Sequence, residues 1–141
     1  MADAGGYEYF EVEADVGVRA WGRTRAEAFA QAALGVLALI VSPDDVQPRE
    51  IREVRAQGRD VETLLVSWIN ECLYVHEIEG FATRHVEVDT LTDVLVHGVL
   101  RGEPMDLSRH GAGTVVKAAT FHGLSVTERD GTHRVSVIVD V

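Results

Sequence analysis

The chain has 141 residues, of which 46% are apolar, a size and content that fit one domain with a core of its own, spanning residues 1–141. Its formal net charge of −10 comes from 13 basic and 23 acidic side chains, and the arginines are scattered among the acids, so we expect no direct binding of nucleic acid, which needs several cations in one footprint. No basic start leads into an apolar core at the N-terminus, and no apolar run approaches the roughly 20 residues that cross a bilayer, so we expect a cytoplasmic protein without a membrane segment.

Two short strands and a helix are expected first along the chain. Residues 7–12 and 16–21 alternate as strands do, and the short connection between them contains Asp15. Thr24 begins a T-x-x-E capping box, and the Ala- and Leu-rich stretch 26–40 after it predicts a helix. Asp15 therefore falls where two strands are joined.

The second helix is the clearest element in the sequence. Asp60 can cap its start, apolar side chains recur at helical spacing from Val61 to Val75, and Gly80 can close it. Cys72, the only cysteine, belongs to the apolar set. We interpret it as a small buried hydrophobe and not as a catalytic thiol.

The remaining segments alternate with period two. They predict a strand before the second helix and mostly antiparallel sheet after it. Two helices and about seven strands without a βαβ rhythm predict a single compact α+β domain, with the two main helices packed on one face of a mostly antiparallel sheet. The segments concerned are 51–57, 86–88, 94–100, 115–126 and 135–139.

The last two residues raise the question of a cation site. The side-chain carboxylate of Asp140 and the α-carboxylate of Val141 lie one residue apart, and hard cations such as Ca²⁺ prefer clustered oxygens. From the residues alone, an exposed acid at a strand end is the simpler interpretation of Asp140, and the same holds for Asp15. Proximity of the two acids would favour a metal site, because close carboxylates repel each other unless a cation lies between them.

Lys117 lies in the middle of a predicted apolar strand. It belongs either to a solvated face, with Val115 and Ala119, or next to the acids, where its ammonium could pair with a carboxylate or an anionic group. Gly111 and Gly113 lack the context of a phosphate-binding loop. The six histidines show no zinc-type spacing, and no nucleophile-elbow sequence occurs.

Four ordered segments of the chain form a recognisable set: Ala14–Gly22, Leu64–Tyr74, His110–Gly123 and Val139–Val141. With these segments the chain resembles the archease family over nearly its whole length. The resemblance implies a small α+β protein that assists an RtcB-type RNA ligase, the enzyme that uses GTP and Mn²⁺ to join RNA ends in tRNA splicing and RNA repair. It also implies that the helper promotes guanylylation of the ligase and multiple turnover and is not itself an enzyme.

The resemblance also implies site residues. The metal-binding acids of the family fall on Asp15 and Asp140, with terminal Val141 as a further ligand, and the functional lysine falls on Lys117. These residues would form an acidic tip that holds a divalent cation, with Ca²⁺ expected before Mg²⁺ or Mn²⁺. Many members have His-Thr-Ala-Asp where this chain has Val-Glu-Ala-Asp over residues 12–15, so no role of that histidine can be transferred, and the role of Glu13 stays open.

Two other functions are compatible with the same residues. One is a stand-alone metal-dependent phosphohydrolase that uses the acids directly, although no nucleophile or base is visible. The other is a chaperone-like binding module. The sequence leaves open the identity of the cation, the oligomeric state and the RNA that is repaired or spliced.

Overall fold

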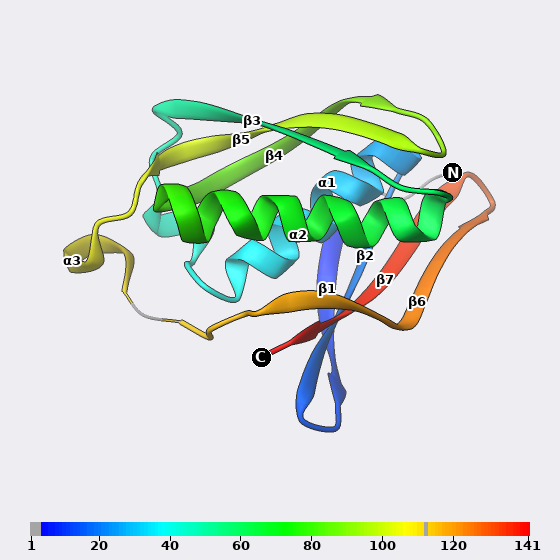
Figure 1. Cartoon of the computed structure of the whole chain (residues 1–141), viewed down its shortest axis with the longest axis horizontal. Helices are drawn as coiled ribbons and strands as arrows, with labels where there is room; N and C mark the ends of the chain where they lie inside the picture. The colour runs from blue at the N-terminus through cyan, green and yellow to red at the C-terminus, as the bar shows by residue number, and fades with distance from the viewer. Residues whose placement is uncertain (1–3, 112) are drawn as a thin grey trace.

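Two antiparallel sheets with two long helices between them make up the computed structural model, which describes residues 4–111 and 113–141 (Figure 1). One sheet has four strands in the order β1-β2-β7-β6, and the other has three in the order β3-β5-β4. The elements in chain order are β1 (Gly6–Val12), β2 (Asp15–Gly22), α1 (Arg25–Ala38), the 3-10 turn η1 (Pro43–Asp45), β3 (Glu50–Gln57), α2 (Val61–Glu79), β4 (Phe81–Leu91), β5 (Leu95–Pro104), α3 (Leu107–His110), β6 (Ala118–Arg129) and β7 (Thr132–Asp140).

Both helices begin and end where local chemistry predicts. The side chain of Thr24 accepts a hydrogen bond from the backbone N–H of Glu27, and Asp60 forms a reciprocal capping box with Thr63 at the start of α2. Gly80 ends α2 with φ 63°, a left-handed conformation that suits a residue without a Cβ. Each helix boundary thus lies within two residues of the predicted one.

The core fills the space between the sheets. Helix α1 contacts β1, β2 and β7 on one side and β4 on the other, while α2 contacts β3, β4 and β5 on one side and β6 on the other. The indole N–H of the fully buried Trp68 donates to the backbone oxygen of Phe29 over 2.9 Å and so connects the two helices. Cys72 is buried as predicted, and burial raises the pKa of its thiol.

The predicted α+β class and the antiparallel pairing are confirmed, but the strands divide into two sheets and the helices lie between them. Alternation reveals which face of a strand is buried without revealing its partner strand. Alanines at Ala28, Ala30, Ala32 and Ala33 are buried around α1, and these small side chains allow sheets to approach the helix closely from two directions.

Two local features differ from the predictions. The strand predicted from Val115 begins only at Ala118, so Lys117 precedes β6 and does not lie in mid-strand. The short helix α3 and the turn η1 carry no amphipathic pattern of their own and were not predicted. In the described residues no helix is long and apolar enough to span a membrane.

Candidate functional site

Asp15 and Asp140 meet at one end of the four-stranded sheet. Val16 on β2 pairs with Val139 on β7, so the next positions on these antiparallel neighbours are Asp15 and Asp140. Paired residues in such ladders have Cα atoms about 4.5–5.5 Å apart and share a face of the sheet. The structure therefore brings together two of the predicted site residues from opposite ends of the sequence.

A tight turn delivers Asp15 to this place. Strands β1 and β2 are joined by Glu13 and Ala14 alone, and Val12 pairs directly with Asp15. Ala14 adopts φ 63°, which is uncommon for a residue with a Cβ. The hairpin projects from the body of the molecule close to the C-terminus (Figure 1).

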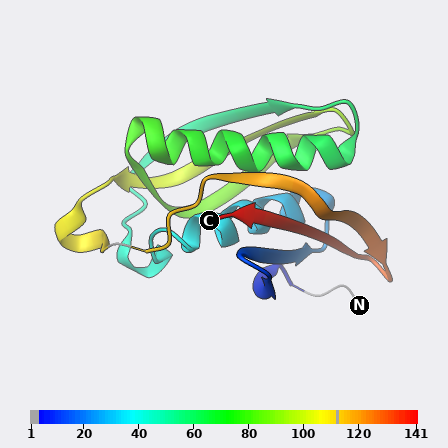
Figure 2. The same ribbon diagram turned by 60° about the horizontal axis from the view of Figure 1, so that its bottom comes forward.

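Lys117 reaches the same point from the residues just before β6. Its backbone N–H donates to the carbonyl oxygen of Asp140 over 2.8 Å, and its side chain is exposed. Figure 2 shows β6 and β7 running side by side below α2, with the C-terminus at the end of β7. Asp15, Asp140 and Lys117 are hereafter called the tip.

The backbone around Lys117 is fixed by neighbouring elements. The amide of Ala119 donates to the side-chain oxygen of Asn70 on α2 over 2.8 Å, and the amide of Thr114 donates to the carbonyl oxygen of Leu39 over 2.9 Å. Asn70 is a site-supporting residue that the sequence did not reveal, although a polar residue within an apolar helical pattern is a visible signal.

Val141 is held as well. Its side chain is half-buried and packs against the main hydrophobic core, in line with Val135, Val137 and Val139, which are fully buried. Last residues usually fray unless they are tied down. This packing restrains the carbonyl and carboxyl oxygens at the end of β7.

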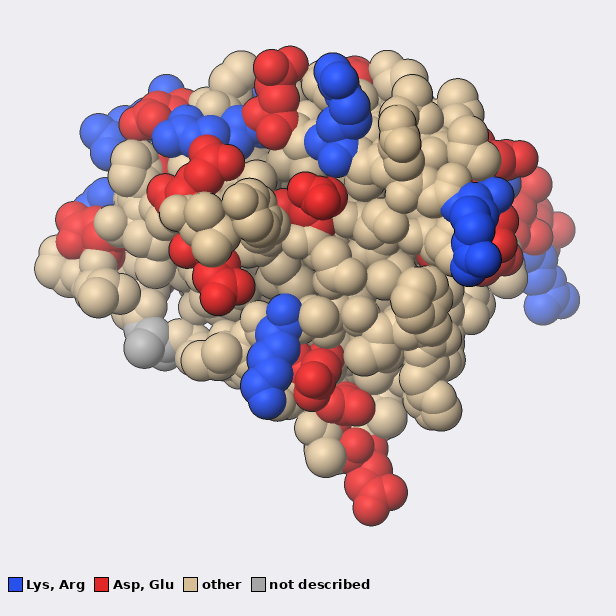
Figure 3. All heavy atoms as spheres, in the orientation of Figure 1, with Lys and Arg blue, Asp and Glu red and all other residues tan. Residues whose placement is uncertain are grey.

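The side chains of the tip are free of internal partners. Within the described part of the chain, Asp15, Asp140 and Lys117 make no side-chain hydrogen bond or ion pair. Acidic side chains gather at the lower end of the molecule in Figure 3, where the hairpin projects, with one basic side chain beside them. The tip thus presents two adjacent carboxylates that can bind a cation from outside.

A divalent cation would need more oxygen ligands than these two side chains supply. Among the described residues no group of three or more His, Cys, Asp and Glu side chains is spaced to hold a metal. Asp15 and Asp140 provide two carboxylates. Further oxygen ligands would have to come from the main-chain end at Val141, from water or from a partner. Such an open oxygen set suits a hard cation.

A second charged cluster lies far more deeply in the structure. Glu103 is fully buried on β5. Its carboxylate accepts hydrogen bonds from Arg109 at 2.9 and 3.2 Å, from Arg49 at 2.8 Å and from the backbone N–H of Gln47 at 2.9 Å. His110 completes this set, which we call the clamp: Glu103, Arg49, Arg109 and His110. The clamp fastens α3 to the three-stranded sheet.

The hydrogen bonds of the clamp define its protonation. Because the amide of Asp106 donates to Nδ1 of His110 over 2.8 Å, the ring proton lies on Nε2, which donates to Glu103 over 3.0 Å. The hydrogen bonds from Arg109 above all, with those from Gln47, His110 and Arg49, hold the pKa of Glu103 far below its usual range. Glu103 therefore carries a full negative charge inside the protein.

Among the described residues the histidines belong to no group of three or more side chains that could hold a metal ion. His97 lies on the outer face of the three-stranded sheet, where Nδ1 is 2.8 Å from Asp89 and Nε2 is 3.3 Å from Glu53. The hydrogen bond with Asp89 is the main cause of a raised pKa of His97. This cluster is a surface ion pair remote from the tip.

Comparison with known proteins places these features in a family context. Residues 7–141 match the model of the Archease protein family (MTH1598/TM1083). Protein archease of Sulfurisphaera tokodaii is 36% identical over 137 residues, covering 96% of this chain and 98% of that protein, and protein archease of Methanopyrus kandleri is 37% identical over 138 residues, covering 96% and 99%.

Two solved structures share the fold. The solution structure of Methanobacterium thermoautotrophicum protein 1598 superposes with a TM-score of 0.79 at 30% identity, covering 96% of this chain and 99% of that one. The crystal structure of an archease from Thermotoga maritima, described as a possible chaperone, gives a TM-score of 0.62 at 19% identity, covering 95% and 96%.

Proposed function

Because the chain belongs to the archease family, we propose that it is an accessory protein that activates an RtcB-type RNA ligase and has no reaction of its own. It would promote GTP-dependent guanylylation of the ligase and multiple turnover during tRNA splicing or RNA repair in the cytoplasm. The observation that carries the proposal is the tip, where Asp15 at the start of β2, Asp140 at the end of β7 and Lys117 just before β6 lie close together, with no side-chain hydrogen bond or ion pair among the described residues.

The tip is suited to act on the metal and nucleotide of another protein. Asp15 and Asp140 would hold a divalent cation, with Ca²⁺ the first candidate and Mg²⁺ or Mn²⁺ as alternatives, and the end of the chain at Val141 would add oxygens. The ammonium of Lys117 would contact the acids or a phosphate group as a compact charge. When bound, the cation would supply positive charge that attracts phosphate oxygens.

The acidic surface fits a protein that acts through a protein partner. A net charge of −10 disfavours contact with the phosphate backbone of RNA, so RNA would be bound by the ligase. The choice of RNA would then belong to the ligase as well.

The sequence Val12-Glu13 in place of the His-Thr of many family members bears on the cation. Val12 lies directly opposite Asp15 in the β1–β2 ladder, so a histidine there would add a nitrogen ligand beside the acid, and valine supplies none. Glu13 is exposed at the turn, where its carboxylate adds negative charge near the tip. The ligand set in this chain is thus one of oxygens, which favours Ca²⁺ or Mg²⁺ over metals that prefer nitrogen.

The test is a guanylylation assay with purified RtcB-type ligase, GTP and Mn²⁺, with and without this protein. We expect Asp15→Ala, Asp140→Ala and Lys117→Ala each to lower the stimulation at least about tenfold, a loss of about 1.4 kcal/mol or more in transition-state or binding free energy. The control is Asp93→Ala, an exposed acid at the β4–β5 turn. Stimulation by the tip variants equal to that of the wild type would refute the role of the tip.

The end of β7 can be tested separately. Deletion of Val141, or a tag fused after it, should lower ligase stimulation more than the same tag at the N-terminus. Only the changes at Val141 disturb the main-chain oxygens beside Asp140. Equal stimulation by both tagged forms would show that the main-chain end takes no part.

A chaperone-like function is the second candidate, because the Thermotoga maritima archease is described as a possible chaperone. It predicts suppression of aggregation of unrelated client proteins without an effect on guanylylation. Metal-dependent hydrolysis of simple phosphate esters that is lost in Asp140→Ala would instead support an enzyme.

A further inference from the structure

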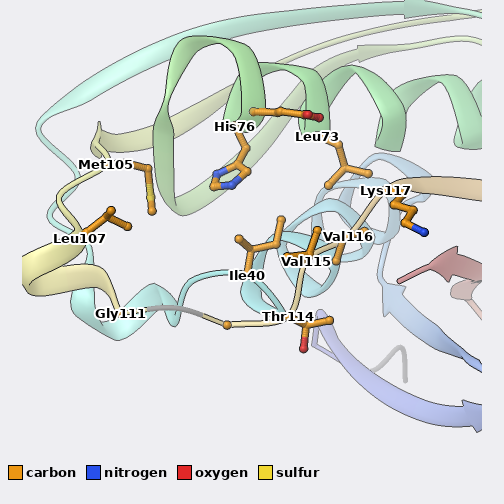
Figure 4. Close-up of a pocket in the computed structure, with 12 residues that line it drawn as sticks. Ile40, Leu73, His76, Met105, Leu107, Gly111, Thr114, Val115, Val116 and Lys117 are labelled. Carbon is orange, nitrogen blue, oxygen red and sulfur yellow. The ribbon is translucent and has the colours of Figure 1, made fainter.

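An apolar pocket of about 430 Å³ lies next to the tip, between the C-terminal half of α2 and residues 105–111 and 113–117 (Figure 4). Leu107 and Val115 stand at this pocket with 77% and 75% of their surfaces exposed, which is costly for large apolar side chains without a partner. Its apolar lining consists of Ile40, Leu73, Met105, Leu107, Val115 and Val116.

The pocket and the tip share a residue. Lys117 lines the pocket, and its amide is bonded to the carbonyl oxygen of Asp140. In Figure 4 its side chain extends from one end of the pocket, on the side where β7 ends. A protein interface of ordinary size that includes Asp140 can therefore extend over the pocket.

Polar side chains of both signs of charge border the apolar walls. His76 donates its Nδ1–H to the carbonyl oxygen of Phe81 over 3.0 Å, which leaves Nε2 as a hydrogen-bond acceptor, and Figure 4 shows the ring directed into the pocket. Glu77 is exposed beside it, and Asp15 and Asp140 lie beyond Lys117. With Glu77 at the pocket and the two acids of the tip beyond Lys117, acids outnumber the lysine here, which favours a partner that carries positive charge next to an apolar group.

The walls are fixed in place before any partner binds. The clamp secures α3, which carries Leu107, and the bond from Thr114 to Leu39 secures the segment that carries Val115. Preformed pockets that accept a side chain save the ordering cost that flexible surfaces pay on binding.

We infer that this pocket takes an apolar side chain of the size of leucine, methionine or phenylalanine, presented by the ligase on a segment with lysine or arginine beside it. The inference rests on the proposed function and adds the anchoring contact that would hold the tip at the ligase. A second copy of this chain is disfavoured as occupant by the net charge of −10, since two such surfaces repel each other. A small ligand is disfavoured because the exposed Leu107 and Val115 would leave much of it in water.

The experiment separates anchoring from activation. Ligase guanylylation is measured over a range of concentrations of the wild type, Val115→Glu, Leu107→Glu and the control Val94→Glu, whose apolar side chain is 48% exposed at the β4–β5 turn. We expect the concentration for half-maximal stimulation to rise at least tenfold for the two pocket variants, with unchanged stimulation at saturation and an unchanged thermal midpoint. Asp140→Ala should instead lower the stimulation at saturation.

Direct binding to immobilised ligase distinguishes this inference from the proposed function. Binding that is weakened tenfold by Val115→Glu but gives no stimulation supports the anchor and refutes activation. Stimulation by the wild type with half-maximal concentrations within twofold for all three glutamate variants overturns the anchor alone. A wild-type dimer that Val115→Glu dissociates, or a small molecule retained by the wild type in native mass spectrometry, also overturns it.

Discussion

The clamp and the tip use the same kinds of side chain in opposite ways. At the clamp, the carboxylate of Glu103 is fully buried and has accepted hydrogen bonds from two arginines, a histidine and a backbone amide. At the tip, Asp15 and Asp140 lie side by side at a sheet end, and among the described residues their side chains make no hydrogen bond or ion pair. Charge is satisfied in the first region and left available in the second.

This difference separates a carboxylate that is held inside the fold from carboxylates that are open to a binding partner. A buried charge without partners would destabilise the fold, so Glu103 needs all its donors. The carboxylates of the tip can remain unpaired because water solvates them. Two close carboxylates repel each other in general, and a cation bound between them removes that repulsion. The predictions below test whether the two regions differ in this way.

The largest effect is expected from Glu103→Gln. The amide cannot accept from Arg49, Arg109 and His110 as the carboxylate does, and we expect the thermal midpoint to fall by about 10 °C. Glu87→Gln is the matched control, because Glu87 pairs with Arg101 on the exposed face of the sheet and such pairs contribute little. Equal thermal midpoints for the two variants in calorimetry would mean that the clamp does not hold the fold.

The pH dependence of the same pair of proteins sharpens this test. Since the pKa of Glu103 is depressed in the folded state, its stabilising contribution is present above the ordinary pKa of glutamate and is lost as the pH falls. The difference in thermal midpoint between wild type and Glu103→Gln should therefore be constant from pH 6 to pH 8 and shrink below about pH 4. A difference that grows on acidification would contradict this.

Calcium should affect the tip and not the clamp. Free Ca²⁺ at about 100 times its Kd should raise the free energy of unfolding of the wild type by about 2.7 kcal/mol. Asp140→Asn should lose this response while unfolding at the same temperature as the wild type in a chelator, whereas Asp93→Asn should keep it. An equal response of the wild type and Asp140→Asn in calorimetry would place the bound calcium elsewhere.

Gly113→Ala should displace the segment that joins the clamp to the tip and so disturb Lys117. A Cβ at this position would overlap with the carbonyl oxygens of Leu39 and Ile40, so the segment must shift, at a cost of about 2 kcal/mol. Gly80→Ala is the comparison, because it introduces only a left-handed alanine, at about 1 kcal/mol, far from the tip. We expect Gly113→Ala alone to lower ligase stimulation, and equal stimulation by both variants would show that the path to Lys117 tolerates displacement.

The smallest effect concerns His97 on the outer face of the other sheet. Asp89 raises the pKa of His97, so its contribution is fully present below pH 6.5 and is lost as the pH rises through the raised value. The advantage of the wild type over His97→Gln in thermal midpoint should decline between pH 6 and pH 9, with His122→Gln as an exposed control on β6. An advantage that persists at pH 9 would show that His97 acts by packing.

The sequence was sufficient for most of the elements. Capping residues and alternation predict the two long helices and the seven strands, because these depend on local chemistry. Asp15, Asp140 and Lys117 come from motif resemblance, and in the structure their backbones lie close together. Their role remains a proposal.

The clamp and the pocket could not be predicted in the same way. Glu103 follows Gly102 near the end of a strand, where an acid is most often solvated, and its donors come from a loop and a short helix of no clear pattern. Only the arrangement of the chain in space brings Arg49 to it. The pocket likewise depends on the path of residues 105–111 and 113–117. Strand β6 begins only after these residues, later than alternation suggests.

The separation of Asp15 and Asp140 along the chain has a consequence for folding. Strand β7 lies between β2 and β6, so the middle of the four-stranded sheet forms only when the strand of residues 132–140 pairs with the hairpin of residues 6–22. Such pairing between segments that are far apart in the sequence is slow, because the intervening chain must first be ordered. Asp15 and Asp140 therefore become neighbours in a late step of folding.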